Sequence, residues 1–169
     1  MSWMNSDGLY VKYGTEEADV AKGGSFNVDG GTHYVEAVVS DFTKLGTTAE
    51  IIGAEDGGNP RGVMVPKGAF IEKVEILMTT AATSGGSATL DIGLIKASDR
   101  STALDDDGLA AAVALTAIDA DGDIVELIQG ATGHGALVGT SLAENGLLCV
   151  AYNTATFTAG ACKVRVYYS

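Results

Sequence analysis

The sequence predicts an all-β protein, a β-sandwich of jelly-roll type with one short helix and an extended N-terminal arm. Three observations favour this class. Apolar and polar residues alternate with a period of two in several segments, as in strands that bury one face. The chain has 23 glycines and only two prolines, a usage typical of many turns between short strands. Signals for about seven to nine strands follow one another at close spacing.

Residues 1–31 show no sustained hydrophobic period, and we expect them to form an extended arm that can include one short strand. Residues 32–169 are predicted to form the β-sandwich domain. The arm carries Trp3, Tyr10 and Tyr13, which we expect to bind a neighbouring protein as the arm orders on contact. Packing of the arm on its own domain is the alternative.

Strand signals span 32–39 and, more briefly, 48–53, and a loop rich in Gly and Asp follows at 54–62. Two hairpins are predicted after this loop, one over 70–96 and one over 148–168. The residues expected to face the core share an alternating apolar pattern: Val35, Ala37, Val39, Val74, Ile76, Met78, Leu90, Ile92, Leu94, Leu148, Val150, Tyr152, Val164, Val166 and Tyr168.

The only predicted helix spans 102–117. Three aspartates, Asp105, Asp106 and Asp107, precede an apolar run at 109–115. Acidic side chains favour a helix N-terminus through capping and the helix dipole. The three carboxylates could also hold a cation, but capping and a solvated face explain them better.

The two cysteines, Cys149 and Cys162, are predicted to be free thiols. A symmetric turn at 153–160 would place Cys162 on the core face of the second hairpin and Cys149 on the opposite face. The two sulfurs could not then reach bonding distance.

No catalytic, cofactor or metal residues are predicted. Asp119, Asp121 and Asp123 alternate as calcium ligands do, but the EF-hand Gly and Glu are absent, so an acidic turn is expected and an irregular calcium site is the alternative. His33 and His134 are the only histidines, and neither lies in a nucleophile motif.

The net charge of −12, from 10 basic and 22 acidic residues, argues against binding to nucleic acid or anionic membranes. The N-terminus has no basic and apolar leader, and the longest apolar run is too short to span a bilayer. We therefore expect the chain to be made and kept in a cytosol, unless it leaves by lysis.

Three segments carry a resemblance to a known group of proteins. Residues 65–74 read VPKGAFIEKV, a Gly-Gly turn at 85–86 precedes TLDIGL at 89–94, and residues 157–168 read FTAGACKVRVYY. This order, with the opening MSWMN and KGG at 22–24, resembles small virion proteins of tailed bacteriophages over nearly the whole chain, most clearly from residue 62 onward.

The resemblance implies a head decoration (cement) protein that binds the major capsid protein, on the capsid exterior of a virion assembled in the host cytoplasm. It also implies a homotrimer and no catalytic residues. The alternative is a glycan- or receptor-binding module of a head or tail fibre, which should show an aromatic cleft. A third hypothesis, an enzyme, would require His33 or His134 beside a nucleophile in a pocket.

Overall fold

The computed structural model describes residues 2–4, 10–12, 24–27, 33–53 and 62–169. These residues form mainly antiparallel strands, with two single-turn 3-10 helices, η1 (Phe42–Lys44) and η2 (Leu115–Ala117). The predicted all-β class is confirmed. No helix in this described part of the chain has the length and hydropathy needed to cross a bilayer.

The first large sheet has its C-terminal strand in the middle. The strands lie in the order β10-β7-β12-β4-β3. Their bounds are β3 (Gly24–Asn27), β4 (His33–Val39), β7 (Ile71–Ser84), β10 (Ile124–Ile128) and β12 (Phe157–Tyr168). Because β12 pairs with both β7 and β4, it joins segments that lie far apart in the sequence.

The second large sheet has the order β5-β11-β8-β9. Its strands are β5 (Glu50–Ile51), β8 (Thr89–Lys96), β9 (Ala103–Ala114) and β11 (Gly146–Asn153), and the short β6 (Met64–Val65) also pairs with β11. A separate two-stranded sheet joins β1 (Ser2–Met4) and β2 (Tyr10–Lys12).

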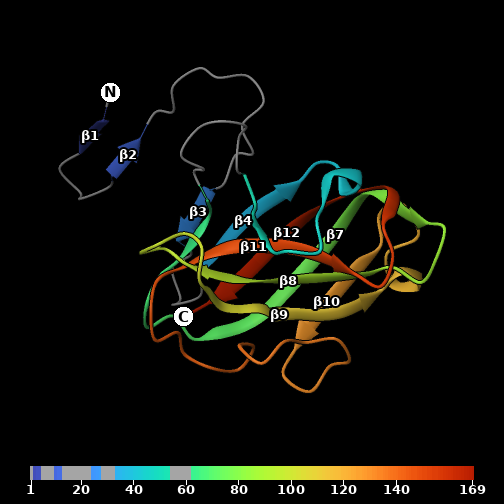
Figure 1. Cartoon of the computed structure of the whole chain (residues 1–169). Coiled ribbons are helices and arrows are strands. Elements are labelled where there is room, and N and C mark those ends of the chain that lie inside the picture. Colours follow the sequence, from blue (N-terminus) through green and yellow to red (C-terminus); the bar gives the residue numbers. More distant parts are fainter. Residues whose placement is uncertain (1, 5–9, 13–23, 28–32, 54–61) are drawn as a thin grey trace.

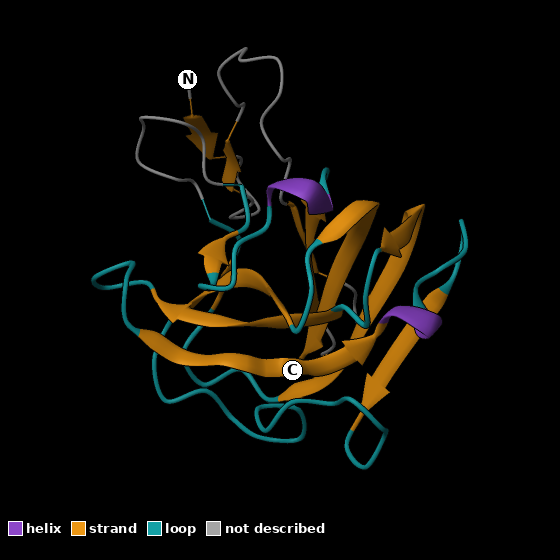
Figure 2. Ribbon diagram, turned by 45° about the vertical axis from the view of Figure 1, so that its right-hand side comes forward, coloured by secondary structure: helices purple, strands orange, loops and turns teal. Residues whose placement is uncertain are grey.

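The two large sheets pack face to face around one hydrophobic core (Figure 1; Figure 2). The strands contribute to it by alternation, so that successive side chains point into the core and away from it. The predicted inward residues of β4, β7 and β8 are all buried, as are Leu148, Val150, Val164 and Val166. Tyr152 and Tyr168 are only partly buried against this core.

Both predicted hairpins are wrong in their pairing. The arms of the first are β7 and β8, and those of the second are β11 and β12, but in each case the two arms lie in opposite sheets. The linkers at 85–88 and 154–156 therefore cross from one sheet to the other. Alternation identifies which face of a strand is buried, but two strands that face each other across a core show the same pattern as two that pair.

Both cysteines are free thiols, as predicted, although the hairpin register on which that prediction was based is wrong. Cys162 lies in the core between the sheets, and Cys149 lies in a small second cluster with Ile51, Ile95 and Leu147. Both are free and buried. Alternation within a strand determines on which face of the sheet each side chain lies, whichever strand it pairs with.

The predicted helix over 102–117 is wrong, since most of this segment is strand β9 and only its end forms η2. β9 bulges away from a regular ladder: Ile92 pairs with Ala110 and Leu94 with Asp105, so β9 uses five residues where β8 uses two. The alanine-rich run has high helix propensity, but pairing with β8 and burial of Leu109 against the core override it.

β3 adds a strand from within residues 1–31 to the first sheet, where it pairs with β4. The predicted loop at 54–62 lies outside the described residues except for Gly62.

Candidate functional site: the outer face of the first sheet and an acidic recess

The solvent-facing side of the β10-β7-β12-β4 strands carries three rows of side chains. Residues directly opposite one another in a sheet share a face, and the strand register aligns them across all four strands. The rows are Ile128, Lys73, Tyr167 and Tyr34; then Glu126, Glu75, Arg165 and Glu36; then Ile124, Leu77, Lys163 and Val38.

Lys73 is the centre of one half of this face. Its Nζ lies 2.8 Å from Glu75 Oε1 and 3.3 Å from Glu126 Oε2, and it stands 4.6 Å from the centre of the Tyr167 ring. The Tyr167 hydroxyl donates to Glu75 Oε2 at 2.8 Å. One ammonium therefore joins three neighbouring strands.

Glu36 is the centre of the other half. Arg165 Nε donates to Glu36 Oε2 at 2.7 Å, and Lys163 Nζ lies 3.9 Å from Glu36 Oε1. Beside them the rings of Tyr34 and Tyr167 lie 5.4 Å apart and tilted by 35°. The charged groups are thus held in place by neighbours on adjacent strands.

The pKa shifts agree with this network. Burial would raise the pKa of Glu75, but hydrogen bonds from Lys73 and Tyr167 outweigh it, so the pKa lies below its usual value. The hydrogen bond to Glu75 raises the pKa of Lys73, and the hydrogen bond to Glu36 raises that of Arg165. These groups keep their charges throughout the neutral range.

The three rows are neutral in sum, with three glutamates against two lysines and one arginine. The whole chain carries a net charge of −12. A partner surface can therefore approach this face without the repulsion that the rest of the molecule presents to acidic proteins. The side chains that stand between the charges are apolar or aromatic, as in the core of a protein interface.

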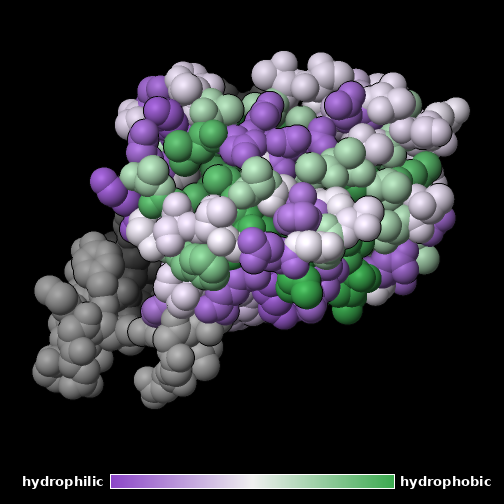
Figure 3. Space-filling model, turned by 90° about the horizontal axis from the view of Figure 1, so that it is seen from below, coloured by the Kyte–Doolittle hydropathy of each residue, from purple (hydrophilic) through white to green (hydrophobic). Residues whose placement is uncertain are grey.

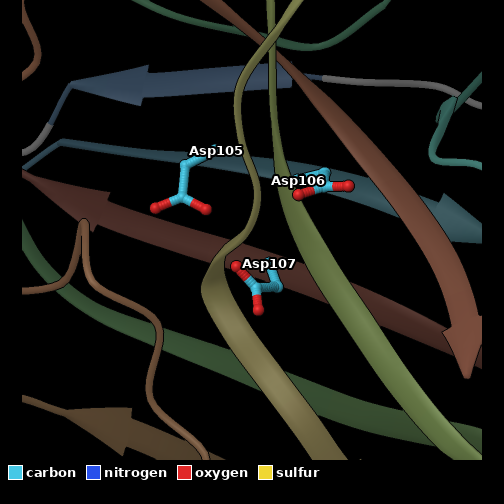
Figure 4. A group of neighbouring side chains, drawn as sticks. All are labelled: Asp105, Asp106 and Asp107. Atoms are coloured by element: carbon cyan, nitrogen blue, oxygen red, sulfur yellow. The ribbon is translucent and has the colours of Figure 1, made fainter.

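An acidic recess of about 210 Å³ lies at the outer side of the second sheet. Asp91, Asp106 and Asp107 line it together with Asn153 and others. Figure 4 shows Asp105, Asp106 and Asp107 gathered around the bend of β9, and one carboxylate oxygen of each lies within 4.8 Å of the others. Oxygen ligands at this spacing suit a hard cation, but exposed acidic groups commonly cluster without one.

Two of these carboxyl groups have raised pKa values. Burial is the main cause of the raised pKa of both Asp91 and Asp105. Repulsion from neighbouring aspartates adds to it for Asp91, and a side-chain hydrogen bond with Asp107 together with repulsion adds to it for Asp105. Asp91 also accepts a hydrogen bond at 2.7 Å from the amide of Ala112, whose φ of 52° forms part of the β9 bulge. The Asp91 carboxyl therefore stabilises the bulge through this hydrogen bond, although burial disfavours its negative charge.

We expect Asp91→Ala to lower the free energy of unfolding by about 1–2 kcal/mol, because the Ala112 amide would lose its partner. Asp91→Asn keeps an acceptor oxygen and removes the charge. A carboxyl whose folded pKa is raised stabilises the fold at pH below its unfolded pKa and loses that contribution as pH rises through the folded pKa. Asp91→Asn should thus match or exceed the wild-type stability at pH 7, and its advantage should shrink towards pH 4.

Urea denaturation of both variants at several pH values would measure this. Asp91→Asn being as destabilised as Asp91→Ala at pH 7 would contradict it, because the loss would then not come from the acceptor.

The Asp119–Asp123 segment forms a turn whose carboxylates bind backbone amides. Asp121 Oδ1 accepts from the amide of Ala81 at 2.6 Å, and Asp123 Oδ2 accepts from that of Ala120 at 2.9 Å. Gly122, at φ 86°, provides the left-handed residue of the turn. These contacts agree with the predicted acidic turn.

The two histidines lie in different segments, His33 on β4 and His134 between β10 and β11. His33 stacks on Tyr168, with ring centres 5.6 Å apart. His134 Nδ1 lies 2.5 Å from the carbonyl oxygen of Ala131, in the segment beside β9. Burial raises the pKa of each cysteine thiol to about 12, so both remain protonated at neutral pH.

The structure places two of the three predicted partner-binding residues. Trp3 is on β1 and pairs with Val11, and Tyr10 is on β2 and pairs with Met4. Tyr13 lies outside the described residues. The outer face of the first sheet was not predicted, because its rows emerge only when the strand order is known. Alternating polar positions on β4, β7 and β12 were the available signal.

No family model matches the sequence. No curated protein matches it significantly. Among solved structures, a chain from "Cyanophage Pam1 capsid asymmetric unit" is similar, with a TM-score of 0.49 and 19% identity over 92% of this chain and 96% of that chain. Similarity at this level does not assign the chain to a family.

Proposed function

We propose that the chain is a non-enzymatic structural subunit of a tailed-phage virion, and specifically a capsid decoration protein that bridges neighbouring major capsid protein subunits on the shell exterior. The resemblance of residues 65–74, 89–94 and 157–168 to small virion proteins carries this proposal. These segments contain the start of β7, most of β8 and the whole of β12, so the resemblance lies in the framework of the fold.

The strand order supports the jelly-roll assignment within this proposal. The sheets β10-β7-β12-β4 and β5-β11-β8-β9 alternate along the sequence in the manner of two interleaved Greek keys. A packed two-sheet body is stiff, because interdigitated core side chains resist deformation. Stiffness suits a subunit that must hold two neighbours at a fixed separation.

Decoration would act by multivalency. A homotrimer presents each of its surfaces three times, so several modest contacts engage a shell together and the effective affinity exceeds that of any one contact. In this scheme the arm residues Trp3, Tyr10 and Tyr13 reach a neighbour. The neutral outer face of the first sheet offers a second contact that the acidic charge of the chain does not oppose.

The proposal is tested by light scattering and by sedimentation with empty capsid shells. We expect a mass of about three times the 17.2 kDa chain, and co-sedimentation with shells. Deleting residues 1–23 leaves β3 in place, so the trimer should survive while shell binding weakens by about tenfold or more. A monomeric full-length chain would refute the trimer, and failure to bind shells would refute decoration.

The aromatic pair of Tyr34 and Tyr167 is the observation that favours the alternative, a glycan-binding module. Outward-facing rings can stack on sugars. Binding to a glycan array that is lost in Tyr34→Ala would support that function in place of decoration.

A further inference from the structure

The strand β10 forms one edge of the first sheet. It pairs with β7 on one side, and no described strand lies on its other side. An edge strand presents unpaired amide and carbonyl groups to which another strand can add. What β10 presents at this edge therefore indicates what can add to it.

The backbone of β10 has its free groups at alternate residues. The amide of Met78 donates to the carbonyl of Asp123 at 2.9 Å, and the carbonyl of Met78 accepts from the amide of Gly122 at 3.0 Å, so both backbone groups of Met78 point towards the β10 side. In an antiparallel ladder, residues whose backbone groups face a neighbouring strand alternate with residues whose groups face away from it. The backbone groups of Ile124 and Glu126 consequently point away from β7, towards the open side, while the carbonyl of Ile128, at the end of the strand, accepts from the amide of Ala131 at 2.9 Å.

The corresponding edge of the second sheet is covered. There the segment at 133–137 lies along β9, and its backbone exchanges hydrogen bonds with Gly108, Leu109 and Ala111. The chain thus covers one edge with its own backbone and leaves β10 open within the described residues.

The side chains of β10 are not those of a protected edge. Ile124 is 66% exposed and Ile128 is 48% exposed, and the strand contains neither lysine nor proline, the residues that usually block edge pairing. Strongly hydrophobic side chains also reach the surface in small groups on the side of the molecule shown in Figure 3. Apolar side chains at an open edge are the features of a strand-accepting site.

The charges around β10 select the partner. Glu126 lies in the middle of the strand, and Asp119, Asp121 and Asp123 stand in the turn that leads into it. Glu126 Oε2 lies 3.3 Å from Lys73 Nζ, but this lysine is shared with Glu75, whose Oε1 lies closer, at 2.8 Å. A second copy of this chain, paired antiparallel about the centre of β10, would set Glu126 opposite its own equivalent, and like charges at such positions destabilise a sheet.

We propose that β10 accepts an extended strand from a different protein, with apolar residues that meet Ile124 and Ile128 and with Lys or Arg residues that face Glu126 and the aspartate turn. The added strand would extend the first sheet to six strands. This deepens the proposed function and rests on it, because the strand donor would be a shell protein.

Two fluorescent peptides of about nine residues test the edge directly. They share an alternating Val/Thr frame and differ only in carrying Lys or Glu at the central position, opposite Glu126, and at the end that meets the aspartate turn. We expect the Lys peptide to bind the full chain about tenfold tighter than the Glu peptide by fluorescence anisotropy, with the difference shrinking at about 0.5 M salt. Equal binding of both peptides, or no binding of the Lys peptide, would overturn the proposal.

Three variants separate the backbone from the charge. Glu126→Pro removes an outward amide, which an edge strand tolerates, and should weaken the Lys peptide by about tenfold or more. Glu126→Gln keeps the amide and should lose mainly the preference for Lys over Glu. Ile124→Lys combined with Ile128→Lys blocks the edge without proline, and should also abolish binding of the Lys peptide. Circular dichroism and thermal melting check that each variant is folded.

Unchanged peptide binding in Glu126→Pro and in the double lysine variant would overturn the edge proposal. Dissociation of a homo-oligomer by Glu126→Pro would also overturn it, because β10 would then pair with a second copy of this chain. If the wild type and Glu126→Pro bind capsid shells equally, the edge proposal fails while decoration stands. If the wild type binds no shells, decoration fails and the peptides alone decide the role of the edge.

Discussion

Replacing Gly93 by alanine should lower the free energy of unfolding by about 3 kcal/mol or more. A Cβ at this position would collide with the backbone of Asp105 and Asp106, where β9 crosses the outer face of β8. Backbone cannot move aside as a flexible side chain can. The β9 bulge would have to move away from β8, and the wall of the acidic recess that it forms would move with it.

The matched control is Gly85→Ala. Gly85 lies in the linker between β7 and β8, and a Cβ there would meet nothing within 4 Å. We expect a change within about 0.5 kcal/mol. Urea denaturation of both variants measures the difference, and equal stabilities would show that β9 does not lie as closely on β8 as described.

Phe42→Ala should lower the free energy of unfolding by about 3–5 kcal/mol. Phe42 is the first residue of η1 and is only 1% exposed. Its ring packs edge-on against Phe157, with centres 5.1 Å apart, and fills the space beside Gly160, where a Cβ would strike it. Truncation would leave a cavity at this end of the core that β12 cannot close without breaking its ladder.

Phe70→Ala is the control for this change. The Phe70 side chain is 41% exposed, and its residue is held by backbone hydrogen bonds to Ser169 that alanine retains. We expect a loss below about 1 kcal/mol in the same denaturation experiment. A loss as large as that of Phe42→Ala would mean that the two rings are equally buried, which contradicts the exposure of Phe70.

Alternation in the sequence was sufficient to find the main strands and their buried faces. β4 and β8 fall within predicted strands, and β7, β11 and β12 overlap with them, because a strand with one face in the core must alternate whatever its partner. β11 begins two residues earlier than predicted, and β7 and β12 extend into the predicted turns at 79–87 and 153–160. The pairing was not predictable in the same way. A linker as short as 154–156 is as compatible with a crossing between sheets as with a hairpin, and only the packed core decides between them.

The helix prediction for residues 102–117 was wrong for a different reason. Its aspartates and alanines satisfy the local rules for a capped helix, and the sequence gives no sign that β8 offers an unpaired edge to it. The three aspartates are adjacent in the sequence, but the place of Asp106 and Asp107 at the recess beside Asp91 depends on the β9 bulge. Contacts between distant strands, rather than local propensity, produced both results.

The position of β12 has a consequence for how the molecule is made. β12 is the central strand of its sheet, yet a ribosome delivers it after β4, β7 and β10 have emerged. Until β12 is synthesised, no strand pairs with both β4 and β7, and their apolar faces remain exposed to solvent. Pairings so distant in sequence close slowly, and unpaired strand edges are prone to aggregate meanwhile. We therefore expect nascent chains stalled before residue 157 to misfold, and synthesis of the chain to benefit from chaperones.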